Sequence, residues 1–392
     1  MLVERTLKNL EKRRENILNG YVNSIPTPFK RFRRDFVGLE QKSYLGITSF
    51  TKTGKTQFTL FLLFEALLFV FNHKDKARMK VFYYILEETD EGILNRFMSF
   101  LLYKIDKIRV APRDLRSTDN DNPVSETILN KFNEEPYKSL LKFFEETFVF
   151  STTDNALGIY TECVQYAKDN GTIHYSEFEY IDEMGQKQIG KNFDHYEPND
   201  PHEFRFVVID HMSLLQQAKG ETLKMAIDEM SKFFAKYLRN RYGFSPIGIQ
   251  QQSIQRESND SVKIGRTRPD REGLADSKST VLDENLLLGL YSPAKFGLKE
   301  YMGYDISRLK DKFRIVEVIA SRDGEIGGLL PLYFDGATNT FWELPRPDDP
   351  QMEDWYRFAA EQMKESHSTK EFILLSFSRI KNIINGITNK KK

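Results

Sequence analysis

One stretch constrains the fold of this chain more than any other: Tyr44-Leu-Gly-Ile-Thr-Ser-Phe-Thr-Lys-Thr-Gly-Lys-Thr56. It is a short apolar run that breaks into a glycine, a lysine and a threonine. Gly54, Lys55 and Thr56 supply, in order, the turn residue, the cation and the hydroxyl that a phosphate loop needs. An apolar segment at 57–71 follows, and a helix there would point its N-terminus at the phosphates. The stretch therefore predicts a strand, a loop that binds a nucleoside triphosphate, and a helix.

The loop also predicts individual roles. Lys55 would reach the β and γ phosphates, and Thr56 would hold Mg²⁺. Ser49 stands five positions before Gly54, where the full pattern has a glycine, and serine is short enough to let the loop close. A chance Gly-Lys-Thr in a turn is the alternative, but it would not need the strand before or the helix after. We expect the nucleotide to be lined by Ser49, Thr53, Gly54, Lys55, Thr56 and Gln57.

Composition limits the setting and the partners. Lysine plus arginine and aspartate plus glutamate both number 57, so any nucleic-acid contact must come from a local basic patch. Cys163 is the only cysteine, which excludes an internal disulfide framework and a cysteine-based zinc site. The most apolar stretch, Phe58 to Phe71, is short and carries Glu65, which favours a buried core helix over a membrane span. We expect a cytoplasmic protein without a membrane partner.

Further apolar runs of strand length, at 80–86, 147–151, 205–210 and 245–252, alternate with helical segments near 91–105, 137–146, 156–170 and 221–240. This alternation predicts an α/β fold with a mostly parallel sheet flanked by helices. Glu87 follows the first of these runs, where ligands bind in open α/β sheets, and could polarise the attacking water. The alternative is that it caps the next helix. Asp210 ends Arg205-Phe-Val-Val-Ile-Asp210, a buried strand that would bring a carboxylate to the Mg²⁺ held by Thr56.

The run at 245–252 ends in three glutamines, Gln250 to Gln252. An amide there could contact the γ-phosphate, and we favour Gln251 or Gln252. A polar loop at 253–278 follows, and a positive segment leaving the nucleotide site is suited to a phosphate backbone. A charged surface loop without a partner is the alternative. Its basic residues are Arg256, Lys263, Arg266, Arg268, Arg271 and Lys278.

Three segments lie outside this pattern. Residues 2–18 form a helix with a narrow apolar stripe that could pack on its own domain or on a neighbouring subunit. Residues 173–204 are acidic, aromatic and glycine-containing, and predict a surface hairpin inserted into the core. After strands at 285–291, 313–320, 329–334 and 340–344, two helices are expected at about 350–365 and 369–385. The predicted organisation is a linker helix at 1–20, a core at 21–345 and a helical extension at 346–392.

The phosphate loop on the first strand of this alternation is typical of a RecA-like core. The later motifs make the chain resemble the C-terminal motor domain of DnaB-type replicative helicases over roughly residues 20–345. The loop at Ser49–Thr56 is similar to that of the family, which also often lacks the first glycine. Ile85-Leu-Glu87 resembles the family's Ser-Leu-Glu, whose glutamate activates water. Val207-Val-Ile-Asp210 matches its Walker B strand, and Gln250-Gln-Gln252 falls where it has a strand-ending glutamine.

The fifth segment is Arg268-Pro269 followed by Gly273-Leu-Ala-Asp-Ser-Lys-Ser-Thr-Val-Leu-Asp283, which is similar to the loop that holds the DNA backbone in the family. The resemblance makes Asp276 a further DNA-contacting residue, although Ala275 stands in place of the family's arginine and Lys278 in place of its glycine. Ala320-Ser-Arg322-Asp-Gly324 is similar to the segment whose basic residues reach the phosphate bound by the next subunit. Its arginine is kept as Arg322, and its lysine is replaced by Ala320.

The resemblance implies an ATP- and Mg²⁺-dependent helicase motor that encircles single-stranded DNA as a homo-oligomeric, hexameric ring. It also implies a primase or loader as a partner, the bacterial cytoplasm if a phage encodes the chain, and a helix at 2–18 that docks on the adjacent subunit. The family's N-terminal domain is missing, so we expect a trimmed phage-type or mobile-element helicase, or a ring ATPase that has left replication. Two alternatives remain: a RecA-like scaffold that binds ATP and assembles on DNA without unwinding it, and a ring ATPase that acts on proteins.

Overall fold

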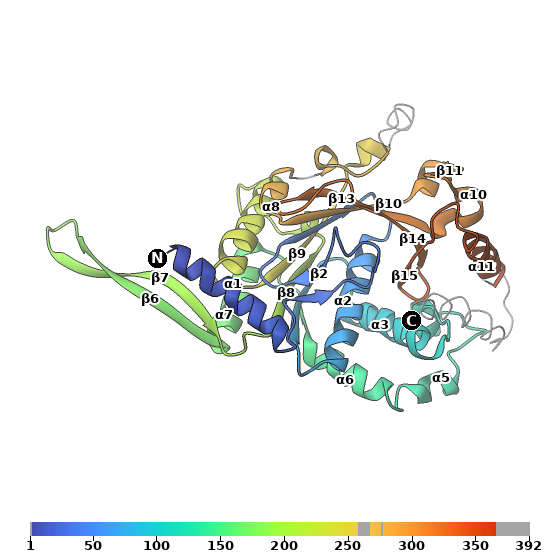
Figure 1. The fold of residues 1–392 in the computed structure, drawn as a ribbon, viewed down its shortest axis with the longest axis horizontal. Helices are drawn as coiled ribbons and strands as arrows, with labels where there is room; N and C mark the ends of the chain where they lie inside the picture. The colour runs from blue at the N-terminus through green and yellow to red at the C-terminus, as the bar shows by residue number, and fades with distance from the viewer. Residues whose placement is uncertain (1, 258–266, 276, 366–392) are drawn as a thin grey trace.

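The computed structural model describes residues 2–257, 267–275 and 277–365. A nine-stranded sheet forms its centre (Figure 1). Six neighbouring strands run parallel: β5 (Phe148–Ser151), β4 (Arg78–Ile85), β8 (Glu203–Asp210), β9 (Ser245–Gln251), β3 (Leu45–Ser49) and β10 (Leu286–Tyr291). Three antiparallel strands follow β10 in the order β13 (Phe313–Ser321), β14 (Leu329–Asp335) and β15 (Thr340–Glu343). The predicted α/β class with a mostly parallel sheet is confirmed.

Helices cover both faces of the sheet, because its central strands are apolar on both sides. In β4, Val81 and Tyr83 face one hydrophobic core, and Phe82 and Tyr84 face the other. The first core is closed by α2 (Lys55–Asn72), α3 (Asp90–Asp106) and α6 (Tyr137–Thr147). The second core is closed by α7 (Ala156–Asp169), α8 (Leu223–Lys232) and the π-helical segment η2 (Phe233–Arg239) that continues α8.

Helix α2 is the central helix of the first core. Among the described residues it is the one helix long and apolar enough to cross a membrane by length and composition, but 61% of it is buried inside the protein. Phe58, Phe61 and Phe64 pack there against aromatic rings of neighbouring elements. The predicted buried core helix is therefore confirmed, and this packing fixes the helix whose first turn follows the phosphate loop.

Within the described residues the expected strands and helices are present, with shifts of a few residues at their ends. The predicted helix at 221–240 changes to π-helical hydrogen bonding after Lys232. Helix α11 (Met352–Glu365) packs Trp355 and Tyr356 in a third core with β13 and β14, whereas the helix predicted at 369–385 lies outside the described residues. The shorter elements are β1 (Ser24–Pro26), β2 (Gly38–Glu40), α4 (Pro112–Leu115), α5 (Glu126–Lys131), β11 (Glu300–Tyr301), β12 (Tyr304–Asp305) and α10 (Ile306–Leu309).

Two elements extend from this body. Strands β6 (Gly171–Ile181) and β7 (Lys187–Pro198) form the predicted hairpin, a long arm that projects away from the sheet (Figure 1). Helix α1 (Leu2–Leu18) leaves its apolar stripe open: the exposed fractions are 70% for Val3, 54% for Leu7, 59% for Leu10 and 56% for Ile17. The stripe is thus not packed on the described part of its own domain.

Candidate nucleotide-binding site

The loop between β3 and α2 has the backbone shape of a phosphate loop. Lys52 and Gly54 both have positive φ angles, 55° and 102°, so the chain turns twice before α2 begins at Lys55. A glycine is needed at position 54 because a side chain at this φ would be strained. The turns place the free N–H groups of the first turn of α2 at the carboxyl edge of the sheet, where an anion is favoured.

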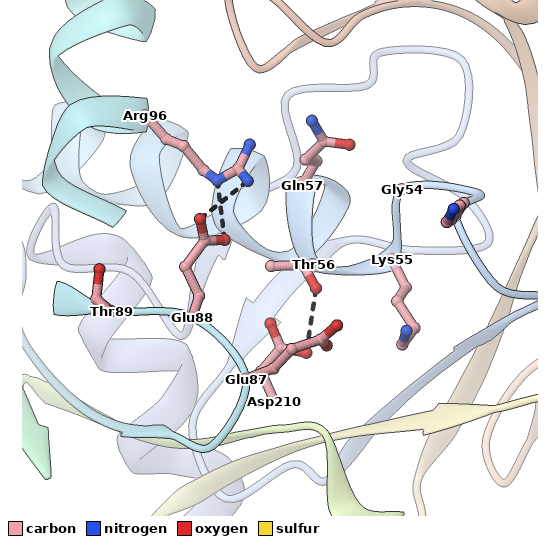
Figure 2. A pocket seen from close by; sticks show the side chains of 10 residues that line it. Gly54, Lys55, Thr56, Gln57, Glu87, Glu88, Thr89, Arg96 and Asp210 are labelled. Carbon is pink, nitrogen blue, oxygen red and sulfur yellow. Dashed lines mark hydrogen bonds and ion pairs between the residues drawn. The ribbon is translucent and has the colours of Figure 1, made fainter. Parts of the chain in front are cut away.

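Thr56 and Asp210 meet at the base of this site. Strand β8 lies two places from β3 in the sheet, and its last residue is Asp210. The Thr56 hydroxyl donates to Asp210 Oδ1 at 3.2 Å, and the Tyr83 hydroxyl donates to Oδ2 at 2.9 Å (Figure 2 shows the first contact). A hydroxyl and a carboxylate are hard oxygen donors, which suit Mg²⁺. These residues therefore fit the ion predicted from the sequence.

Burial dominates the electrostatics of Asp210. The side chain is almost fully buried, and this raises the pKa of its carboxyl to about 6. The hydrogen bonds from Thr56 and Tyr83 and the charge of Lys55 act in the opposite direction, while the charge of Glu87 raises the pKa further. At neutral pH the carboxyl of Asp210 is therefore mostly ionised, and a bound cation would balance its buried negative charge.

Glu87 lies two residues beyond β4, beside Asp210. Its side chain is 54% exposed, and its Oε2 atom lies 3.7 Å from Nε2 of the buried His211. Figure 2 shows Lys55, Thr56, Glu87 and Asp210 converging on the same space. A partly solvated carboxylate at this position can accept a proton from a water molecule.

A cavity of about 630 Å³ opens over these residues. Glu87 and Asp210 line it together with Gly54, Lys55, Thr56 and Gln57 from the predicted set. The sequence reasoning did not assign Lys52, Glu88, Thr89 or Arg96, which also line it. Glu88 is held by Arg96 through two hydrogen bonds of 3.0 Å, and Thr89 caps α3. Glu88 and Arg96 are eight residues apart on a turn and a helix, a spacing without a recognisable motif.

Ser49 and Thr53 do not line the cavity, so the prediction that they line the nucleotide site is wrong for this structure. Both are buried, and the Ser49 hydroxyl donates to the carbonyl of Phe50 at 2.9 Å. The Ser49 side chain is thus engaged with the backbone of the next residue.

Arg314 supports the loop from the antiparallel side of the sheet, and the sequence reasoning missed it. It is buried at the start of β13, and its Nε atom donates to the carbonyl of Thr53 at 2.7 Å. The same guanidinium donates to Ser292 Oγ at 3.1 Å and pairs with Asp311 at 3.0 Å. The sequence contains one indication of this role, an arginine within an apolar strand. A buried charge needs polar partners, so such an arginine indicates a contact with another part of the fold.

The three glutamines at the end of β9 have different surroundings. The Gln250 amide oxygen accepts from Thr280 at 2.9 Å, and the buried Gln252 amide donates to Thr48 and to the Asp270 carbonyl, both at 3.0 Å. Gln251 is only partly buried and pairs with Ser49 in the sheet. None of the three lines the cavity. Of the two glutamines favoured as a sensor, Gln251 has the less constrained surroundings.

Two arginines of the described part of the basic loop pair with carboxylates. Arg256 pairs with Asp270 within the loop, and Arg268 pairs with Glu317 of β13 at 2.5 Å. Arg271 and Lys278 are exposed. Arg266 and Asp276, the other two residues predicted to contact DNA, lie outside the described residues. Glu257, at the start of the loop, accepts from the Thr51 hydroxyl at 2.8 Å, so the basic loop is hydrogen-bonded to the phosphate loop.

Arg322 lies far from the cavity of its own chain. It follows β13, whose last residue pairs with Leu286 at the start of β10, and Leu286 pairs with Leu45 at the start of β3. The phosphate loop follows the other end of β3. Arg322 is exposed and donates to the carbonyls of Leu282 and Glu284. Arg322 and the cavity of the same chain thus lie at opposite ends of the parallel strands.

The chain has a RecA-like α/β fold, and the loop between β3 and α2 has the shape of a phosphate loop. Two solved structures share the fold: a DnaB-like replicative helicase described with its interactions with primase, and the ATPase domain of a second protein. The helicase is 16% identical over 87% of this chain and 67% of that chain, with a TM-score of 0.58. The ATPase domain is 16% identical over 88% of this chain and 99% of that chain, with a TM-score of 0.60. No protein-family profile and no curated protein sequence matches the chain.

Proposed function

We propose that this chain is the ATP-hydrolysing motor of a DnaB-type DNA helicase. The observation that carries the proposal is the meeting of Lys55, Thr56, Asp210 and Glu87 in one cavity at the carboxyl edge of the sheet. The two relatives in fold, a replicative helicase and an ATPase domain, agree with it.

In this proposal each residue has one task. Lys55 and the N–H groups of the first turn of α2 bind the β and γ phosphates of ATP. Thr56 and Asp210 hold Mg²⁺, which neutralises charge developing on the phosphates. Glu87 orients the attacking water and accepts its proton. Gln251 does not line the cavity, so it would have to move toward the loop to contact the γ-phosphate; its strand continues into the basic loop.

The contact between Glu257 and Thr51 supports a link between nucleotide and DNA. Lys295 also bonds Glu257, at 2.8 Å, so three residues tie the tip of the phosphate loop to the start of the basic loop. A rearrangement of the phosphate loop would be transmitted to Arg256, Arg271 and Lys278. Single-stranded DNA bound by these residues would in turn alter hydrolysis, because such coupling is reciprocal.

The first test is hydrolysis and its response to DNA. We expect the wild-type protein to hydrolyse ATP faster with single-stranded DNA and to displace a strand from a forked duplex. Lys55→Ala should lower the ATPase rate at least about 100-fold, because it removes the cation that binds the transferred phosphate. Lys138→Ala, at an exposed site away from the cavity, is the control.

The remaining outcomes separate the alternatives. Full ATPase activity in Lys55→Ala would overturn the enzymatic proposal. Stimulation by DNA without strand displacement would support the RecA-like scaffold that assembles on DNA without unwinding it. The pairing of Arg256 and Arg268 with carboxylates agrees with this alternative, because paired arginines are less free to bind DNA. Absence of any response to DNA would favour a ring ATPase that acts on proteins.

We further propose that the motor is a ring in which Arg322 completes the pocket of the next subunit. Its place at the opposite end of the parallel strands supports this, because it cannot serve the pocket of its own chain. Arg322→Ala should lower the ATPase rate by about 1,000-fold or more while nucleotide affinity changes little.

A mixing experiment tests this contribution between subunits. Lys55→Ala and Arg322→Ala chains should each be inactive alone, and a mixture should regain part of the rate. The Arg322→Ala chain keeps an intact pocket, and the Lys55→Ala chain keeps an intact Arg322. Where these two chains are neighbours in a mixed ring, they form one complete site. Arg116→Ala, an exposed arginine elsewhere, should retain the wild-type rate. A mixture as inactive as its components, or an active Arg322→Ala chain, would refute the shared site.

A further inference from the structure

Three potential metal ligands gather at the base of the projecting hairpin, away from the nucleotide site. His174 of β6 lies directly opposite His195 of β7, and Glu197 follows two residues later on the same face. One ligand atom from each of the three lies within 4.8 Å of the others. A cross-strand pair and its neighbour two residues along are held by the ladder, so the backbone already brings these side chains together.

The two imidazole rings are arranged in a specific way. They stack with centroids 4.2 Å apart and planes inclined by 6°. His174 Nε2 is shielded from solvent, has no hydrogen-bond partner among the described residues and lies 3.4 Å from Glu197 Oε2. A buried ring nitrogen without a hydrogen bond is costly unless another partner, such as a cation, takes its lone pair.

Asp194 provides the second layer of such a site. Its Oδ2 atom lies 2.9 Å from His195 Nδ1, which makes Nδ1 the protonated nitrogen and leaves the lone pair on Nε2. Metal-binding histidines commonly donate their other N–H to a carboxylate, which fixes the ring and makes it a better ligand. Asp194 can take this position because the strand pairing shifts register between His174 and Tyr175 and leaves it without a partner across the ladder.

From this cluster we infer a zinc site made of His174, His195 and Glu197. Two imidazoles and a carboxylate are a frequent ligand set for Zn²⁺, with a water molecule in the fourth position. Zn–N distances of about 2.1 Å place tetrahedral ligands about 3.4 Å apart. The 3.4 Å between His174 Nε2 and Glu197 Oε2 already equals that spacing, and the ligand atom of His195 lies within 4.8 Å of both. The two stacked rings would have to turn apart for both lone pairs to meet one ion. The ion would join β6 to β7 where the arm leaves the body.

The test is metal binding by the full-length, nucleotide-free protein in excess Mg²⁺, which occupies oxygen sites. Isothermal titration with Zn²⁺ should give one ion per chain, and Co²⁺ should give the intense visible absorption of a tetrahedral site with nitrogen ligands. His174→Gln and His195→Gln should each weaken binding at least tenfold. His73→Gln, a partly buried histidine at the end of α2, is the matched control.

Two further variants keep the test decisive if the histidine variants perturb the hairpin. Glu197→Gln, whose side chain is 71% exposed, should weaken Zn²⁺ binding without unfolding the arm. Asp194→Asn should weaken it about tenfold, because it removes only the carboxylate behind His195. Zn²⁺ should also raise the melting temperature of the wild-type protein more than that of these variants. Absence of Zn²⁺ binding, or equal affinity in all variants, would overturn the site.

Discussion

At the scale of single residues, the site combines side chains that a sequence motif predicts with others that only the folded structure shows. Lys55, Thr56 and Asp210 stand in a recognisable order along the chain. Tyr83 does not, because a tyrosine within an apolar strand is expected in the core, and its hydroxyl reaches Asp210 only through the pairing of β4 with β8. Lys55, Thr56 and Asp210, which line the cavity, could be predicted from sequence, whereas the residue that orients Asp210 depends on which strands become neighbours.

Tyr83→Phe should shift the pH dependence of hydrolysis. Asp210 must be ionised to hold Mg²⁺, so kcat/KM should fall as pH decreases through its pKa of about 6. The Tyr83 hydroxyl stabilises the carboxylate and lowers this pKa, so its loss should move the acid limb upward by about 0.5 to 1 pH unit. Tyr84→Phe, which faces Cys163 on the other side of the sheet, should leave the profile unchanged. An unshifted profile in Tyr83→Phe would contradict this role.

At the scale of elements, the antiparallel strands do more than close the sheet. Strand β13 could be predicted as a largely apolar run of strand length, but the task of Arg314 could not. That task depends on β13 lying next to β10 and β10 next to β3, which brings the guanidinium beneath the phosphate loop. Pairings between segments so far apart along the chain leave no periodic signal in the sequence. The hairpin arm is the opposite case, since its strands are local and its outline was predictable.

Arg314→Lys should loosen the phosphate loop. Lysine keeps the charge but cannot donate to Thr53, Ser292 and Asp311 at once, because it lacks the planar fork of arginine. We expect nucleotide affinity to fall about tenfold, measured by titration with a fluorescent ATP analogue, and thermal stability to decrease. Arg308→Lys, which breaks a similar arginine–carboxylate contact with Glu353 on the surface, is the control. Equal affinity in both variants would show that Arg314 does not position the loop.

At the scale of the whole molecule, two features bear on the proposed assembly: the exposed stripe of α1, and the position of Arg322 far from the cavity of its own chain. An amphipathic helix with its apolar face in water is weakly stable alone, since most helical stability in proteins comes from packing. The sequence left open whether α1 packs on its own domain, and the structure shows the stripe exposed. Packing of the stripe against a neighbouring chain would supply the burial that its own domain does not.

Leu10→Glu should weaken self-association and leave the fold intact. Leu10 is 59% exposed, so a charge there costs little in the isolated chain but would be buried in an interface. We expect a lower mass by light scattering with nucleotide bound, and a circular dichroism spectrum like that of the wild type. Asn9→Glu introduces the same charge one residue away, off the stripe, and should assemble normally. If both variants assemble like the wild type, α1 is not part of the interface.

If Arg322 completes the site of the next chain, as proposed, the opposite positions of Arg322 and the phosphate loop would determine how many active sites an assembly has. Each chain would give its Arg322 to one neighbour and receive the Arg322 of the other neighbour in its own pocket. An open head-to-tail row of n chains would then complete n − 1 sites and leave one pocket and one arginine unused at its ends. Only closure into a ring completes all n. On the proposed shared site, an open assembly is always short of one active site, and closure itself supplies the last one.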